Sequence, residues 1–75
     1  MASSVKVNGT LIRRLREQRG IERPELAQSV GITPHHMYVI EVRDQRTTPK
    51  TLRRIAAALS VLPERLVDEE SVVRI

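Results

Sequence analysis

Arginine is the residue type with the most distinctive chemistry in this sequence. All but two of the 13 basic residues are Arg, whose planar guanidinium pairs with phosphate groups and with the major-groove edge of guanine. Residues 1–54 contain 11 basic and 5 acidic side chains, whereas residues 55–75 contain 2 and 4. This distribution favours a polyanionic partner, either nucleic acid or an anionic membrane surface. A GC-rich genome also explains the abundance of Arg, but not its location.

The two histidines, His35 and His36, are the obvious candidates for metal ligands. Adjacent side chains on a helix point in different directions, and no third ligand is placed nearby in the sequence. The absence of Cys excludes disulfides and thiolate metal sites. We therefore predict no metal site and no cofactor.

Other patterns that would indicate catalysis are missing from the sequence. It has no Ser–His–Asp arrangement, no paired-carboxylate pocket and no phosphate-cradling glycine loop, and 75 residues leave little room for a cavity. We expect a protein that is not an enzyme and has no small-molecule substrate. No stretch approaches the roughly 18 apolar residues of a membrane span, so a cytoplasmic location without membrane contact is expected.

Two charged residues interrupt apolar helix faces. Arg16 follows Leu15 and Glu41 follows Ile40, at positions where an isolated charge would be costly to bury. We therefore predict a largely buried ion pair between Arg16 and Glu41, which would join the first helix to the end of the third.

Caps and apolar periodicity predict an all-α fold, a compact bundle of five short helices. Thr33-Pro34 and Thr48-Pro49 are start signals, because Thr caps a helix and Pro is tolerated at its first position. Gly20 and Gly31 are stop signals. The predicted helices span residues 8 or 10 to 19, 23–30, 34 to about 41, 49–59 and about 63–66. The chain is expected to form one domain over residues 1–75, with its core in residues 8–67 and terminal segments 1–7 and 68–75.

The terminal segments are rich in β-branched residues. Val5 and Val7 alternate with polar neighbours, which is typical of a strand. We predict a small antiparallel ribbon between them and Val72, Val73 or Ile75, within one chain or between two. The alternative is that both ends fray.

The most informative stretch is residues 24–41, which has the pattern of a helix, a tight turn at Gly31 and a second helix. Small Ala27 lies where the two helices would cross closely, and Ile32 fills the corner between them. This pattern predicts a helix-turn-helix unit, whose second helix enters the DNA major groove.

From Leu11 to Leu66 the sequence resembles the phage Cro and repressor helix-turn-helix domains, the Cro/C1-type or xenobiotic-response-element family. The matching segments occur in order and without a gap. They are Leu15-Arg16-Glu17, Gly20-Ile21, Glu25-Leu26-Ala27, Val30-Gly31-Ile32, Ile40-Glu41, Thr51-Leu52, and Ile55-Ala56-Ala57-Ala58-Leu59 followed by Val61.

The resemblance implies roles for individual residues. The N-terminal end of the third helix would face the bases, through His35 and His36, with Val39 one turn further on. Phosphate contacts would come from helix starts, where unpaired N–H groups favour anions, and from the loop after the third helix. The implied phosphate-binding residues are Arg23, Thr33, Arg43, Arg46 and Lys50.

The sequence departs from the family pattern at three positions. Glu22 replaces the usual Ser or Thr cap of the second helix, and Pro34 occupies a position that often holds Gln. Arg43 replaces the glycine that commonly ends the third helix, so either the helix continues or a non-glycine residue is left-handed.

The resemblance implies a sequence-specific regulator of transcription that binds double-stranded DNA. A homodimeric repressor or autoregulator would bind half-sites about 34 Å apart. The alternative, favoured by Pro34 and Arg43, is a protein-interaction adapter or antitoxin with weak or no base recognition.

Overall fold

Helix starts follow the capping residues of the sequence in the computed structural model, which describes residues 4–68. The hydroxyl groups of Thr33 and Thr48 accept hydrogen bonds from the backbone three residues further on, at 3.0 and 3.2 Å. Glu22 begins its helix differently, because its N–H donates to the carboxylate of Glu25 at 3.2 Å. The elements are β1 (Val5–Lys6), α1 (Gly9–Gln18), α2 (Arg23–Val30), α3 (Pro34–Tyr38), the π-helix η1 (Val39–Arg43), β2 (Arg46–Thr47), α4 (Pro49–Leu59) and the 3₁₀-helix η2 (Pro63–Leu66).

The predicted helical fold is confirmed, but the count of five helices is slightly off, and a short internal strand is added. Residues 4–68 form four α-helices, one π-helical turn, one 3₁₀-helix and a two-stranded sheet. The last predicted helix, Pro63–Leu66, has four residues and is 3₁₀-helical, the usual form of so short a segment. The fold remains mostly helical.

The third helix continues past the position where the family pattern has glycine. Its backbone changes from α to π geometry at Val39, whose carbonyl accepts from the Asp44 N–H at 2.9 Å. Arg43 is therefore the last residue of a ten-residue helical path, α3 plus η1. The left-handed residue comes two positions later, at Gln45, with φ of 54°.

The predicted N-terminal strand is present, and its partners among the described residues were not predicted. β1 pairs antiparallel with β2, with Val5 opposite Thr47, and Val7 forms an isolated bridge with Val67. The predicted partners 72, 73 and 75 lie outside the described residues. β2 lies beside β1 because the loop after η1 places an extended segment next to it.

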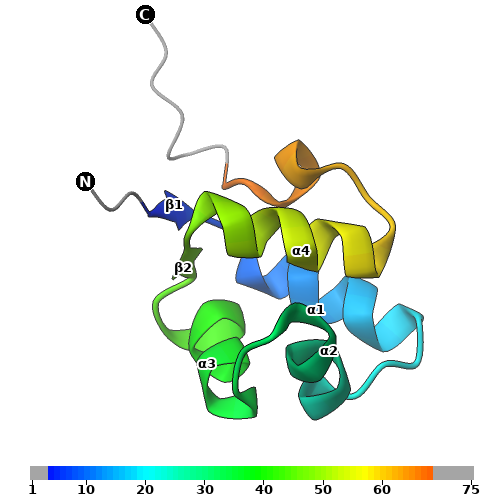
Figure 1. Ribbon diagram of the computed structural model, residues 1–75. Coiled ribbons are helices and arrows are strands. Elements are labelled where there is room, and N and C mark those ends of the chain that lie inside the picture. Colours follow the sequence, from blue (N-terminus) through cyan, green and yellow to red (C-terminus); the bar gives the residue numbers. More distant parts are fainter. Residues whose placement is uncertain (1–3, 69–75) are drawn as a thin grey trace, which may run out of the picture.

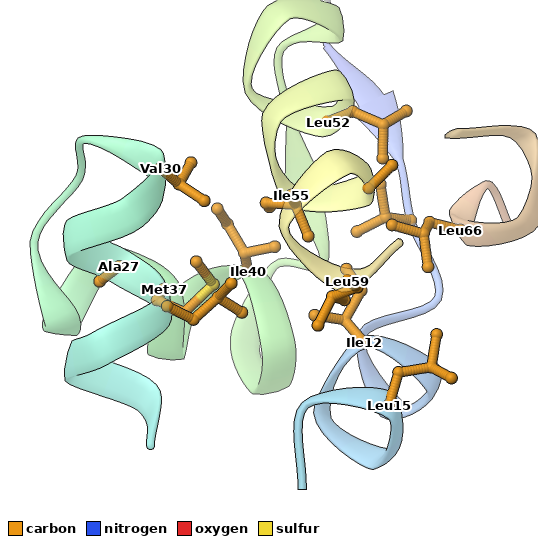
Figure 2. Packing of buried hydrophobic residues seen from close by; sticks show 13 residues of the cluster. Ile12, Leu15, Ala27, Val30, Met37, Ile40, Leu52, Ile55, Leu59 and Leu66 are labelled. Atoms are coloured by element: carbon orange, nitrogen blue, oxygen red, sulfur yellow. The ribbon is translucent and has the colours of Figure 1, made fainter. Parts of the chain in front are cut away.

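The core is aliphatic (Figure 2). Every α-helix contributes to it. Val7, before α1, and Leu66, in η2, also belong to the core. Tyr38 is half-buried at its edge. The core residues are Val7, Ile12, Leu15, Leu26, Ala27, Val30, Met37, Ile40, Leu52, Ile55, Ala56, Leu59 and Leu66.

The helices pack so that α2 and α3 form one end of the molecule (Figure 1). α2 packs against α3 and α4, while α1 packs against η1 and η2. The strand pair lies beside the start of α4. Within residues 4–68, no helix has the length and apolar character needed to span a bilayer.

Candidate nucleic-acid interface

The helix-turn-helix unit consists of α2, the turn at Gly31 and α3. Gly31 has φ of 87°, a left-handed conformation that suits glycine, and its N–H closes α2 on the carbonyl of Ala27 at 2.9 Å. Ile32 donates to the same carbonyl at 3.0 Å and packs half-buried against the core. Ala27 is fully buried where the helices meet. The turn thus fixes the direction of α3 relative to α2.

The start of α3 presents its side chains to solvent. Thr33 caps the helix and is exposed, and both His35 and His36 are exposed. Val39, at the first residue of η1, is half-buried. On the opposite side of the same helical path, Met37 and Ile40 are fully buried. Of the three implied base-contacting residues, His35 and His36 therefore face solvent, whereas Val39 is only partly exposed.

Three side chains from α2 and α3 stack on one another beside this surface. The rings of His35 and Tyr38 lie 6.3 Å apart between centroids, with 27° between their planes. The guanidinium carbon of Arg23 lies 5.3 Å from the centroid of the Tyr38 ring, within cation–π distance. The side-chain position of His35 is thus linked to α2 through Tyr38. Spacing within α3 alone could not indicate this contact, because Arg23 is 15 residues from Tyr38 along the chain.

Behind the stack, Glu41 forms the centre of an ion network. Its carboxylate accepts from Arg16 Nε at 2.9 Å and from Arg16 Nη2 at 3.2 Å, and their side chains are 0% and 6% exposed. The predicted Arg16–Glu41 pair is therefore present and buried. Arg16 also donates to the Ile21 carbonyl at 2.8 Å. This bidentate geometry, with a further acceptor, is what a buried guanidinium requires.

Arg23 is the third member of this network. Its Nε lies 3.2 Å from Glu41 Oε1, and its side chain is 30% exposed. Two guanidinium groups thus share one carboxylate, which leaves one net positive charge close to the start of α2. Arg23 contacts Glu41 and Tyr38, so its first role in the fold is structural.

The junction of α1 with η1 requires a residue without a side chain. A Cβ atom on Gly9 would lie 2.8 Å from the carbonyl oxygen of Ile40 and within 3 Å of the carbonyl carbon of Glu41. Glycine allows the start of α1 to touch the η1 backbone. This contact joins the two segments that carry Arg16 and Glu41.

The other implied phosphate-binding residues lie at the end of η1 and in the two elements that follow it. Arg43 ends η1, Arg46 belongs to β2 and Lys50 is the second residue of α4, and all three are exposed. Arg46 Nη1 lies 3.4 Å from the Ser4 hydroxyl. These cations lie on three successive elements after the helix that carries His35.

Metal ligands are not gathered at this surface. Within residues 4–68, no group of three or more His, Cys, Asp or Glu side chains is close enough to hold a metal ion.

Residues 9–69 match the family model described as a helix-turn-helix domain. The chain belongs to this family. No curated protein sequence matches the chain significantly.

Solved structures of regulators have the same fold. The SinR protein in its complex with SinI superposes with a TM-score of 0.74 at 26% identity, over 84% of this chain and 62% of that chain. This chain therefore spans less than two thirds of that SinR chain. The DNA-binding domain of SinR, the master biofilm regulator of Bacillus subtilis, has a TM-score of 0.69 at 29% identity, over 89% of this chain and 99% of its own.

A third structure shows how widely the fold extends. The restriction-modification controller protein C.AhdI from Aeromonas hydrophila has a TM-score of 0.70 at 23% identity, over 75% of this chain and 85% of that chain. These similar structures are of regulators rather than enzymes. The predicted resemblance to Cro/C1-type helix-turn-helix domains is confirmed.

Proposed function

We propose that this protein is a transcription regulator that binds specific double-stranded DNA sites with the helix that starts at Pro34. The observation that carries the proposal is the outer face of α3, where His35 and His36 are exposed directly after a capped helix start. An α-helix fits the major groove, and imidazole groups can hydrogen-bond base edges or flanking phosphates there. SinR, which is similar in fold, has been crystallised in complex with DNA, and that structure matches at 29% identity.

Phosphate contacts would flank this helix on both sides. Arg43, Arg46 and Lys50 are exposed after it, and the capped start at Thr33 follows α2. Arg23 contributes the remaining positive charge of the Glu41 network at the start of α2. Neutralising roughly 4 phosphates per protomer gives a dimer a slope of about −7 for log affinity against log salt concentration.

The proposed active form is a homodimer on two half-sites about 34 Å apart, located in the cytoplasm on the nucleoid. Such a dimer would repress or autoregulate nearby genes by occupying the sites. An adapter or antitoxin that has lost base recognition is the second candidate, and Pro34 favours it because it offers no hydrogen-bond donor to a base.

Selection of binding sites from random double-stranded DNA, followed by mobility shifts across a salt series, tests the proposal. The expected result is one enriched motif, bound with a steep negative salt slope. Arg46→Ala should weaken all DNA sequences alike, since phosphate contacts carry no sequence information. Arg65→Ala, an exposed arginine on η2 far from α3, is the matched control and should leave affinity unchanged. A flat salt slope with no enriched motif would favour the adapter.

A further inference from the structure

Asn8 is the only asparagine in the sequence, and glycine follows it directly. In such a pair the backbone nitrogen of glycine can attack the side-chain carboxamide of the asparagine, because glycine has no side chain that shields this nitrogen. Asparagine is accordingly among the thermolabile residue types. Asn8 is exposed, so water reaches its carboxamide. The pair Asn8-Gly9 therefore has the groups needed for a spontaneous reaction.

The fold uses both residues of this pair. Asn8 caps α1, since its Oδ1 accepts from the Leu11 N–H at 3.0 Å. Gly9 touches the η1 backbone, where a Cβ atom would lie 2.8 Å from the carbonyl oxygen of Ile40. A short polar cap and a residue without a side chain are thus needed at successive positions. The reactive pair is a consequence of how α1 begins.

The native conformation keeps the reacting atoms apart. Ring closure requires the Gly9 nitrogen to eclipse Cβ of Asn8 about the Cα–C bond. Asn8 has ψ of 88°, which turns this nitrogen nearly to the side opposite Cβ. The Gly9 N–H also donates to Gln45 Oε1 at 3.3 Å, and the Asn8 N–H donates to the Leu66 carbonyl at 2.7 Å. The start of α1 must therefore leave these partners before Asn8 can react.

The reaction in an opened chain needs water alone as co-reactant. The Gly9 nitrogen bonds to Cγ of Asn8, its proton passes to the carboxamide nitrogen, and ammonia leaves as the Cγ–N bond breaks. Water then opens the cyclic imide at one of its two carbonyl groups. Attack at Cγ gives aspartate at position 8. Attack at the main-chain carbonyl gives isoaspartate, in which the main chain runs through Cβ and Cγ.

The two products differ in whether the domain can close again. Aspartate is a good N-cap, and its negative charge suits a helix N-terminus. Isoaspartate adds one atom to the main chain between Val7, which is 0% exposed, and Gly9, which has no free space towards η1. The Val7 N–H is itself held by the Gln45 carbonyl at 2.8 Å. The extra atom must therefore break the contacts on one side of position 8.

We propose that Asn8-Gly9 is a spontaneous modification site that the folded domain keeps unreactive, and that isoaspartate formation prevents an opened domain from closing again. The inference is independent of DNA binding. The reaction occurs in molecules whose N-terminal segment has opened, and local opening is rare where backbone groups are held by hydrogen bonds. The folded chain should therefore react at least about tenfold more slowly than the unfolded chain.

The test incubates the full chain at mildly alkaline pH, with and without guanidinium chloride, and follows its intact mass. The mass rises when the amide –NH₂ is replaced by –OH, and peptide mapping locates the change and separates isoaspartate from aspartate. We expect conversion at Asn8 in denaturant and at least about tenfold slower conversion in buffer. Gly9→Ala should slow the reaction in denaturant, because its methyl group shields the nitrogen.

A second pair of variants tests the protection by the fold. Gln45→Ala removes the acceptor of the Gly9 N–H, so it should speed conversion in buffer and leave the rate in denaturant unchanged. Gln28→Ala, an exposed glutamine on α2, is the matched control and should keep the wild-type rate in both conditions. Equal rates for the folded and unfolded wild-type chain would refute the protection.

The stability of the products tests the second part of the proposal. Chains converted in denaturant and returned to buffer should melt at a lower Tm when they contain isoaspartate, whereas Asn8→Asp should melt at or above the wild-type Tm. Isoaspartate chains with the wild-type Tm would refute the block to closure. No mass gain in denaturant would show that Asn8-Gly9 is not a modification site.

Discussion

Replacing Glu41 with Gln tests the ion network at the centre of the molecule. The change keeps the size of the side chain but removes the single carboxylate that Arg16 and Arg23 share. Arg16 is 6% exposed, so its charge cannot regain water without opening the fold. Breaking a buried pair by removing one partner costs about 3–5 kcal/mol. The free energy of unfolding of a 75-residue domain is itself only about 4–11 kcal/mol.

The loss should be measured by thermal and urea unfolding followed by circular dichroism. For a domain of this size, 1 kcal/mol shifts Tm by about 4–8 °C, so Glu41→Gln should lower Tm by at least about 12 °C. The chain offers a matched control in Glu17→Gln. Glu17 accepts from Arg13 at 3.1 Å, but both side chains are 55% exposed, and such helix pairs contribute less than about 0.5 kcal/mol.

A double replacement separates charge from packing. Arg16→Met combined with Glu41→Leu removes both members of the buried pair, and Arg23, which is 30% exposed, can turn to solvent, so most of the stability should return. If Glu41→Gln instead melts within about 2 °C of wild type, as Glu17→Gln should, the network does not contribute to stability and the reasoning from burial is refuted.

Three further outcomes are expected. Gly9→Ala should lower the free energy of unfolding by about 1–3 kcal/mol, because the added methyl group overlaps the η1 backbone. Gly20→Ala meets no neighbouring atom and should lower it by about 1–2 kcal/mol, from its φ of 67° alone. Equal Tm values for Gly9→Ala and wild type would disprove the contact at Gly9. Arg46→Ala should reduce the salt slope by about 1 per protomer, and an unchanged slope would remove Arg46 from the phosphate contacts. His35→Ala should weaken binding to the selected site about tenfold and relax selectivity at one base position. If the variant binds that site with wild-type affinity, base recognition lies elsewhere on the helix.

Local signals in the sequence were sufficient for most helix boundaries. Thr33 and Thr48 cap α3 and α4 as predicted, since a cap depends on residues within one turn. Arg16 and Glu41 could be paired from sequence because each interrupts an apolar face. Their partner Arg23 could not be predicted, because it is partly exposed at a helix start and the carboxylates of Glu22 and Glu25 are much nearer to it in the sequence than Glu41 is.

Features set by distant contacts were not predictable. The pairing of Val5 with Thr47 depends on where the loop after η1 passes the N-terminus. The π geometry from Val39 depends on which carbonyl the Asp44 N–H reaches. The sequence left two possibilities at Arg43, a longer helix or a left-handed residue. The structure has the longer helix, with the left-handed backbone at Gln45.

The bridge between Val7 and Val67 has a consequence for biosynthesis. Val7 is fully buried, and Asn8 donates to the Leu66 carbonyl at 2.7 Å, so the segment before α1 is held by the end of η2 and the residue after it. On a ribosome that adds about 5–20 residues per second, roughly 3–12 seconds separate the synthesis of the two valines. Val7 must therefore remain without its bridge until all four α-helices and η2 have been made. Val7, made before the first α-helix, thus takes its final place in the core only after translation has passed η2, whereas β1 can pair with β2 earlier.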